Sequence, residues 1–410
     1  MFISAWSILA FFYLATQPSL SSGAAGPNAS KMDFTKMAVL LGDQDAAIVA
    51  TPDGTVLFAH NPDKERIPAS TIKLLTALAA FQYLKSDFRF TTEFYLDNDA
   101  SLKIRGQGDP LLISEKVSDI AVALAIELKG PQRRLNHLVL DNTYFASPIT
   151  IPGVSGSTEP FDAPIGALCV NFNTVNFKQK NNTFVSAEPQ TPLLPMVQPG
   201  IKASGLKKGR ITLSHQQDEI TYYAGHLFQY FLEQAGFEFS GRITIEPVSP
   251  QDRPVLSYHA GLTLDQVVAR MLKYSNNFIA NQVFIRMGIM QYNAPGTLAK
   301  GVLAVQAYAR NELGLASLTI VEGSGISRMN RITARDMLKV LRAFEPHHVL
   351  MRKKGRLYYK TGHLKGIRTQ AGFYLDREKG FHPYVILLNT PGKSMNPVVK
   401  KLVHALERGN

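Results

Sequence analysis

Residues 67–80 read IPASTIKLLTALAA, and this stretch decides the class of fold. Its apolar density and its helix formers, placed after Pro68, predict a buried helix that begins close to Ser70. On such a helix Lys73 lies one turn from Ser70, on the same face. A serine hydroxyl needs a neighbouring base before it attacks a carbonyl, and a helix start offers oriented N–H groups to the oxyanion that forms. The stretch therefore predicts a serine nucleophile activated by a lysine.

The Ser-x-x-Lys spacing is not specific by itself, because the chain contains a second copy. Ser204 and Lys207 have the same separation. Gly205, Gly209 and the surrounding lysines indicate an exposed turn, where no buried helix positions a base. We therefore assign no chemistry to Ser204 and Lys207.

Two further motifs follow the nucleophile along the chain. Ser275 and Asn277 interrupt two helical runs, so their side chains can project from a connection into a cleft, the hydroxyl as a proton relay and the amide as a substrate contact. Lys360, Thr361 and Gly362 end a strand-like run. There, a cation, a hydroxyl and a glycine that admits a ligand close to the backbone would hold a carboxylate. The order of the three elements is that of the motif set of penicillin-binding proteins and serine β-lactamases.

Four other segments make this resemblance narrower. They are residues 106–111, 138–145, 170–173 and 322–330, which read GQGDPL, LVLDNTYF, VNFN and EGSGISRMN. Together with the three motifs, they resemble the landmarks of the D-alanyl-D-alanine carboxypeptidase/endopeptidase family typified by penicillin-binding protein 4 (peptidase family S13). The resemblance runs from about residue 46 to the C-terminus. That family has a transpeptidase-like domain with a large insertion between the first two motifs, and the long separation of Ser70 from Ser275 is similar to that layout.

The resemblance implies a catalytic role for three of these residues. Ser70 would be acylated with Lys73 as its base, and Ser275 would pass a proton to the leaving D-alanine. Asn277 would hold the substrate amide. For Lys73 to act as a base its pKa must fall, through desolvation or through the nearby Lys360 cation.

The same resemblance implies the remaining substrate contacts. Lys360 and Thr361 would bind the terminal carboxylate of the substrate. The backbone N–H of the nucleophile and that of His363, which follows Gly362, would form the oxyanion hole. The family usually has Thr or Ser at the position of His363 and Asp at that of Glu322, so these two residues depart from its pattern.

The fold that these observations predict is of the α/β (α+β) class, a β-lactamase/transpeptidase-like antiparallel sheet flanked by helices. Residues 46–50 and 56–60 indicate a hairpin around a Pro-Asp-Gly turn. Helices are predicted at residues 263–273, 298–312, 333–344 and 397–408, and late strands at 356–361, 370–375 and 383–388. We expect transpeptidase-like parts at residues 25–88 and 258–410, around an inserted β-rich module at 89–257.

The amino terminus has the pattern of an export signal. Residues 1–30 carry no charged side chain, and an apolar run from Phe2 to Ala15 precedes a stretch of small residues. This pattern predicts a signal peptide at residues 1–24. The run is shorter than the roughly 20 residues that span a bilayer, so we expect a periplasmic or otherwise exported protein without a transmembrane anchor.

Charge and motif content limit the partners. The formal net charge of +12 favours a basic solvated surface and leaves peripheral contact with an anionic membrane or wall open. The absence of a long Lys/Arg run and of zinc-finger spacing argues against nucleic acid. Gly-x-Ser-x-Gly, His-Glu-x-x-His and Walker patterns are absent, so we expect no metal and no cofactor. The lone Cys169 lies in an apolar run and is expected to be buried. The resemblance implies peptidoglycan stem peptides and β-lactam antibiotics as ligands, and leaves the oligomeric state open.

The favoured function is thus a serine D-alanyl-D-alanine carboxypeptidase/endopeptidase that penicillins acylate. One alternative is a serine β-lactamase or esterase on the same scaffold, which needs a deacylating group that the sequence does not identify. The other is a catalytically silent peptidoglycan-binding protein. The complete set of motif residues argues against the silent protein, because such a protein has no reason to keep all of them.

Overall fold

The computed structural model describes residues 32–408 of the chain. The signal peptide expected at residues 1–24 lies outside this range. Within it, none of the helices combines the length and the apolar character that crossing a membrane requires.

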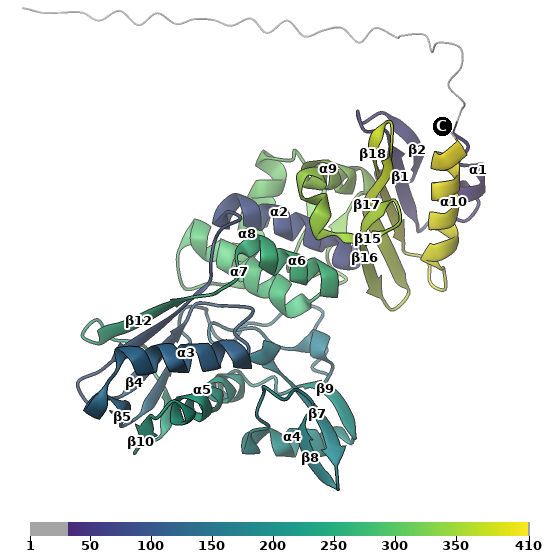
Figure 1. Cartoon of the computed structure of the whole chain (residues 1–410). Coiled ribbons are helices and arrows are strands. Elements are labelled where there is room, and N and C mark those ends of the chain that lie inside the picture. The colour runs from purple at the N-terminus through teal and green to yellow at the C-terminus, as the bar shows by residue number, and fades with distance from the viewer. Residues whose placement is uncertain (1–31, 409–410) are drawn as a thin grey trace, which may run out of the picture.

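A six-stranded antiparallel sheet joins the two ends of the described chain (Figure 1). Its strand order is β15-β16-β17-β18-β1-β2. The strands are β1 (Ala46–Ala50), β2 (Val56–His60), β15 (Arg352–Lys354), β16 (Leu357–Leu364), β17 (Ile367–Asp376) and β18 (Gly380–Leu388). The early hairpin and the three late strands predicted from the sequence are confirmed, and the pairing of β1 with β18 closes them into one sheet.

Helices cover both faces of this sheet. One face packs against α9 (Ala334–Phe344) and α2 (Lys73–Leu84). Around α2 pack α6 (Leu264–Tyr274), α7 (Asn277–Tyr292) and α8 (Leu298–Asn311), and these helices enclose the largest apolar core together with the sheet. The other face packs against α10 (Met395–Arg408) and the short α1 (Thr35–Ala38). A two-stranded sheet, β13 (Leu318–Thr319) with β14 (Arg331–Ile332), directly precedes α9 along the chain. The predicted helices of this part are confirmed.

Burial on both faces explains why β1 is apolar at every position. Ala46, Ile48 and Ala50 point into the core beneath the α2 layer. Ala47 and Val49 alternate with them and point into the core beneath α10. A central strand covered on both sides therefore has a continuous apolar run and no alternation with polar residues.

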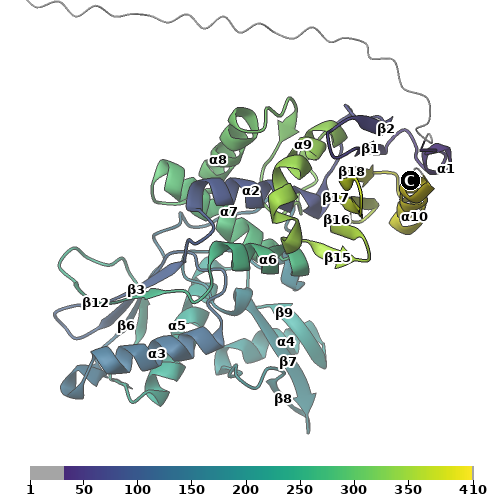
Figure 2. The same ribbon diagram turned by 45° about the horizontal axis from the view of Figure 1, so that its top comes forward.

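The middle of the chain forms separate sheets (Figure 2). A mixed five-stranded sheet has the order β11-β6-β4-β3-β12, and a three-stranded antiparallel sheet has the order β8-β7-β9. The strands are β3 (Thr91–Leu96), β4 (Leu102–Gly106), β6 (Leu138–Asp141), β7 (Thr174–Lys180), β8 (Thr183–Ser186), β9 (Lys208–Thr212), β11 (Ile243–Ile245) and β12 (Arg253–His259), with a small pair β5 (Arg134–Leu135) and β10 (Glu238–Phe239). These sheets have their own apolar core. On this ground we propose the division into an insertion at 89–257 and a surrounding transpeptidase-like part.

Three helices within the insertion were not expected from the sequence. They are α3 (Ser114–Glu127), α4 (Gln198–Ser204) and α5 (Gln217–Gln234). Both α3 and α5 pack against the five-stranded sheet, with buried residues of both helices in the same core as the strands. The insertion therefore has strands where they were predicted, but it is a layered α/β unit.

A fourth apolar cluster joins the insertion to α7. Phe278, Ile285 and Ile289 of α7 pack with buried residues of the insertion loops, which include Phe145 and Cys169. The thiol of Cys169 is buried as expected, and burial raises its pKa to about 12. Because α7 also carries motif residues at its start, this cluster ties the insertion to the candidate site.

Candidate active site

Ser70 lies in a tight turn that leads into α2. Residues Ala69–Ile72 form a 3-10 turn, and the α-helix begins at Lys73, so the predicted helix start is displaced by one turn from the serine. Ala69 has a positive φ of 47°, which turns the chain sharply before Ser70. Gly325 lies against this bend, because a Cβ there would come 2.1 Å from the carbonyl oxygen of Ala69. The nucleophile is therefore held by a bend that packs against a glycine.

Lys73 is fully buried beneath Ser70. Its Nζ lies 3.0 Å from Ser70 Oγ, 2.8 Å from Asn277 Oδ1 and 2.5 Å from the carbonyl oxygen of Ser324. Burial, followed by the positive charge of Lys360, holds the pKa of Lys73 well below its usual range, while the Glu322 carboxylate acts in the opposite direction. The structure thus contains both causes that lower the pKa of Lys73, namely burial of the amine and the nearby Lys360 cation.

The three contacts of Lys73 are all with oxygen atoms, so they can be made by an ammonium that donates three times or by a neutral amine that donates twice. The Asn277 and Ser324 oxygens belong to carbonyl groups and can only accept, so each takes one N–H. A neutral amine has two N–H groups and one lone pair. In the structure Lys73 Nζ donates to Ser70 Oγ, and the Ser70 hydroxyl donates to the Ser324 carbonyl oxygen at 3.4 Å. When the amine is neutral, its lone pair can take the place of the third N–H and face the Ser70 hydroxyl.

Ser275 and Asn277 come from the connection between α6 and α7. Ser275 ends α6 in the left-handed region, with φ of 52°, and Asn276 caps α7 by accepting the N–H of Ile279 at 2.9 Å. The hydroxyl of Ser275 accepts a hydrogen bond from Lys360 Nζ at 2.8 Å. Asn277 accepts from the amine beneath the nucleophile. Its Nδ2 also donates to the carbonyl oxygen of Phe161 in the insertion, at 3.2 Å.

The middle of β16 supplies the third motif. The sequence predicted that Lys360–Gly362 end the strand, but β16 stays paired with β17 as far as Leu364. Lys360 is 3% exposed, and burial, followed by the charge of Arg352, lowers its pKa to about 7. A Cβ on Gly362 would come 2.7 Å from the backbone nitrogen of Ser70, so only a glycine lets β16 approach the nucleophile this closely. The pairing of β15 with β16 ends at Tyr359, so beyond that residue this edge of β16 has no strand partner.

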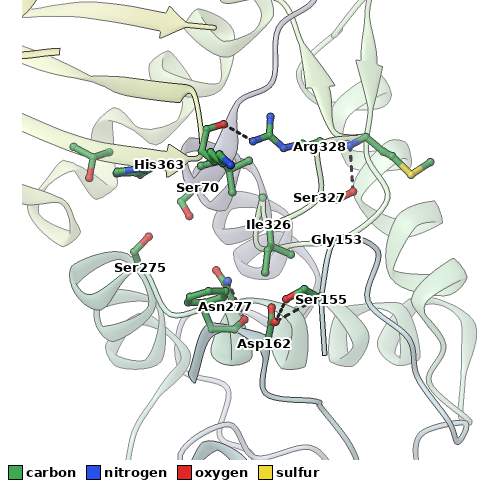
Figure 3. A pocket seen from close by; sticks show the side chains of 16 residues that line it. Ser70, Gly153, Ser155, Asp162, Ser275, Asn277, Ile326, Ser327, Arg328 and His363 are labelled. Carbon is green, nitrogen blue, oxygen red and sulfur yellow. Dashed lines mark hydrogen bonds between the residues drawn. The ribbon is translucent and has the colours of Figure 1, made fainter. Parts of the chain in front are cut away.

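These residues surround a cavity of about 740 Å³ (Figure 3). Figure 3 shows Ser70 and His363 on one side of it, Ser275 and Asn277 on another, and Ile326 and Ser327 opposite. The side chain of His363 also contacts the guanidinium of Arg368, its partner across the strand pair. Of the residues predicted from the sequence, the cavity is lined by Ser70, Ser275, Asn277, Thr361 and His363, while Lys73, Lys360 and Gly362 lie directly behind it.

The second Ser-x-x-Lys pair is excluded from this site. Ser204 ends α4, and its hydroxyl donates to the carbonyl oxygen of Ile201 at 2.7 Å. Gly205 follows in the left-handed region, and Lys207 is exposed. The prediction of a surface turn is confirmed.

Two groups of cavity residues were not predicted to have a role. The first is the loop that follows β13, where the buried carboxylate of Glu322 accepts hydrogen bonds from Ser324, Gly325, Ser327 and Asn330. This loop holds the Ser324 carbonyl against Lys73, and its EGSGISRMN pattern was the available signal.

The second group comes from the insertion and consists of Gly153, Ser155, Phe161 and Asp162. Their spacing in the sequence contains no signal for this position.

Metal-binding chemistry has no support from side-chain clustering in the described part of the chain. Among residues 32–408, His, Cys, Asp and Glu side chains form no group of three or more that could hold an ion.

Comparison with known proteins agrees with the geometry. A family model described as "D-Ala-D-Ala carboxypeptidase 3 (S13) family" matches residues 34–204 and 197–352. The chain belongs to this family. The matched ranges include the first two motifs and end before the Lys-Thr-Gly strand. The family resemblance predicted from the motifs is confirmed.

Two curated proteins that are similar to this chain are named as carboxypeptidases. A D-alanyl-D-alanine carboxypeptidase of Actinomadura sp. is 27% identical over 342 residues, which cover 72% of this chain and 63% of the relative. The D-alanyl-D-alanine carboxypeptidase DacB of Haemophilus influenzae is 24% identical over 326 residues, which cover 70% of this chain and 67% of the relative. The chain therefore spans about two thirds of the length of the curated relatives it matches.

A solved structure shows the same fold. The crystal structure of penicillin binding protein 4 (dacB) from Haemophilus influenzae superposes with a TM-score of 0.72 at 19% identity, covering 91% of this chain and 99% of that one. The predicted fold class, an antiparallel transpeptidase-like sheet flanked by helices and carrying an insertion, is confirmed.

Proposed function

We propose that the protein is a serine D-alanyl-D-alanine carboxypeptidase that also acts as a D,D-endopeptidase on peptidoglycan stem peptides. One observation carries this proposal: Lys73 Nζ is buried between Ser70 Oγ and two carbonyl oxygens, so a base whose pKa is lowered by burial lies within hydrogen-bond distance of the nucleophile. Family membership and the activity named for both relatives support the choice of a D-alanyl peptide bond.

Acylation begins with transfer of the Ser70 proton to Lys73. As the proton leaves, Ser70 Oγ forms a bond to the carbonyl carbon of the penultimate D-alanine, and the carbonyl oxygen becomes an oxyanion. The backbone N–H groups of Ser70 and His363 stabilise that charge. The free edge of β16 beyond Tyr359 offers main-chain groups that hold the substrate in an extended conformation beside the serine.

Collapse of this intermediate breaks the C–N bond of the substrate. The leaving amine takes a proton from Ser275, and Ser275 takes one in turn from the Lys360 ammonium through the 2.8 Å hydrogen bond. Lys360 and Thr361 bind the terminal carboxylate while Asn277 holds the amide. Water then attacks the acyl-enzyme and gives a proton to Lys360 by way of Ser275. Lys73 returns its proton to Ser70 Oγ as the shortened peptide leaves.

Penicillins fit the same sequence of steps. Their strained cyclic amide is attacked by Ser70, but the leaving amine stays attached to the acyl group and obstructs the approach of water. A stable penicilloyl adduct is therefore expected. We further propose that the protein is exported, because its substrate polymer lies outside the cytoplasm and residues 1–24 have a signal-peptide pattern.

Labelling with a fluorescent penicillin tests the proposal. The unmodified protein and a Ser204→Ala variant should label equally, since Ser204 belongs to the surface copy of the motif. A Ser70→Ala variant should not label at all. Equal labelling of the Ser70→Ala protein, or no labelling of the unmodified protein, would refute the assignment of the nucleophile.

Product analysis separates the activities. Release of D-alanine from a pentapeptide shows the carboxypeptidase, and conversion of crosslinked dimers to monomers shows the endopeptidase. Rapid release of the penicilloyl group with restoration of the free enzyme would instead favour the β-lactamase alternative. Labelling without turnover of either peptide would favour a wall-binding protein.

A further inference from the structure

A second cavity lies on the sheet face opposite to α2. It measures about 840 Å³ and runs between α10 and the strands β15, β16 and β17. We call it the α10 groove. Its floor is apolar and aromatic, and it consists of Leu357, Tyr359 and Tyr374 from the strands with Val399 and Val403 from α10. A floor of this kind suits the apolar parts of a bound chain, and it leaves the choice of ligand to the polar groups around it.

The polar groups around the α10 groove are mostly cationic. Lys354, Arg356 and Lys400 line it together with His404, and Glu407 is the acid among the lining residues. Lys354 and Lys400 are exposed, and among residues 32–408 neither has a carboxylate within ion-pair distance. Two flexible ammonium groups that neutralise no acid of the protein are available to neutralise one on a ligand.

One cation of the groove is oriented by a tyrosine, and the carboxylates of Asp376 and Glu407 also act on it. The guanidinium of Arg356 donates to the hydroxyl of Tyr374 at 2.9 Å and lies 5.9 Å from the centre of the same ring. A guanidinium in a fixed orientation can bind both oxygens of a carboxylate. The groove therefore has the features of a carboxylate-binding site, with an aromatic floor, one oriented guanidinium and two free ammonium groups.

One residue of the groove and one residue of the active-site cavity are neighbours across β16 and β17. Thr361 lines the cavity around Ser70, and its register partner across β16 and β17 is Gln370, which lines the α10 groove. A polymer that places one segment beside Ser70 can therefore reach the groove with a neighbouring segment.

We propose that the α10 groove binds a second, uncleaved stem peptide of the same peptidoglycan polymer through its carboxylates. This inference rests on the proposed function, because it takes the polymer to be the substrate. A second contact on one polymer raises the effective concentration of the cleavable stem at Ser70. The shape favours this ligand over a membrane, since a concave groove accepts a single chain, whereas an anionic bilayer needs a flat or convex surface.

The kinetic consequence is confined to polymeric substrates. Loss of the groove raises KM for peptidoglycan, while kcat is unchanged. Soluble pentapeptides contact only the cavity around Ser70, so both of their constants stay the same.

The test compares two charge-reversed proteins. Lys354→Glu/Lys400→Glu alters the groove, and Lys180→Glu/Lys207→Glu makes the same change of net charge at exposed positions of the insertion. Each is combined with Ser70→Ala, and binding to purified peptidoglycan sacculi is measured by cosedimentation. We expect the groove variant to bind about tenfold more weakly than the control variant at low salt, with the difference reduced at high salt.

Two further measurements make each outcome decisive. The same variants with Ser70 intact are labelled with fluorescent penicillin, which reports both folding and the proposed function. Normal labelling with equal binding of both variants to sacculi overturns the groove, whereas absent labelling of the unmodified protein overturns the proposed function instead. Vesicles containing phosphatidylglycerol form the third arm. A groove-dependent loss of vesicle binding with unchanged sacculus binding would replace the stem peptide by a membrane and refute the inference.

Discussion

Replacement of Glu322 by glutamine should disconnect the base from the loop that orients it. The carboxylate of Glu322 is fully buried and takes part in no salt bridge with the described residues. One oxygen accepts from the N–H and hydroxyl of Ser324, both at 2.6 Å. The other accepts from the N–H of Gly325 at 2.7 Å, the N–H of Ser327 at 3.2 Å and the side-chain amide of Asn330 at 2.7 Å. Five donors thus converge on one charge.

The magnitude follows from what glutamine cannot accept. Its amide has one carbonyl oxygen, so its NH₂ group must face two or three of the five donors. Two lost bonds to a charged acceptor, at about 1.5–3 kcal/mol each, amount to about 3–6 kcal/mol. The Ser324 carbonyl, which accepts from Lys73 Nζ at 2.5 Å, would move with the loop. A displacement of about 1 Å at a reacting group lowers a rate about a hundredfold.

The assay combines the rate constant of penicillin acylation with thermal unfolding. We expect acylation of Glu322→Gln to slow by about two orders of magnitude. We expect its melting temperature to fall by about 6 °C or more. Glu322→Asp is the matched control, because it keeps the charge and both oxygens and should lose much less of either property. A Glu322→Gln protein that melts and acylates like the unmodified one would show that the five hydrogen bonds do not hold the base.

Three other predictions concern strand β16 and the second Ser-x-x-Lys pair. Gly362→Ala should abolish acylation while the protein still folds. The new Cβ would come 2.3 Å from Thr369 Oγ1 and 2.7 Å from the Ser70 nitrogen. The acylation rate tests the loss of activity, and circular dichroism tests whether the variant folds. The pKa of Lys360 is lowered to about 7, so in the free enzyme its cation is present below that pH and lost above it. Accordingly, kcat/KM for a pentapeptide should fall as pH rises through about 7, and a constant kcat/KM up to pH 9 would contradict the role of Lys360. Ser204→Ala should leave D-alanine release unchanged and should change the free energy of unfolding by no more than about 0.5 kcal/mol, because its hydroxyl bonds only to the backbone of Ile201 and Leu206 around the end of α4.

The sequence predicted the central sheet well because its signals are local. The hairpin of β1 and β2 follows from two β-prone runs around a turn, and each late strand contains a run of β-prone residues. Pairing of β1 with β18 is not local, and the sequence predicted only that the two ends of the chain form one transpeptidase-like domain, not which strands pair.

Helix α5 shows what the sequence analysis missed within the insertion. Its buried residues Ile220, Tyr223, Ala224, Leu227 and Phe228 recur at helical spacing, so a signal was present. The short strands and Pro-rich loops on either side of it favour a β-rich region. A helix that covers one side of a sheet was therefore read as part of a β-rich region.

The residues of the site were predicted, but the contacts between them were not. Spacing places Lys73 beside Ser70, yet nothing in it brings Asn277 or the Ser324 carbonyl to the same amine. These contacts depend on how α7 and the loop after β13 pack around α2. The wall that Phe161 contributes from the insertion is likewise a product of tertiary packing, and no local pattern indicates it.

Two residues at the site occupy backbone conformations that glycine would adopt more readily. Ala69 precedes the nucleophile with φ of 47°, and Ser275 follows α6 with φ of 52°. Each left-handed non-glycine residue costs about 1–2 kcal/mol. A library of this protein screened only for heat resistance would therefore be drawn toward glycine at both positions. At position 275 the more stable variant would lack the hydroxyl that meets Lys360, so directed evolution of this fold needs selection for activity in every round.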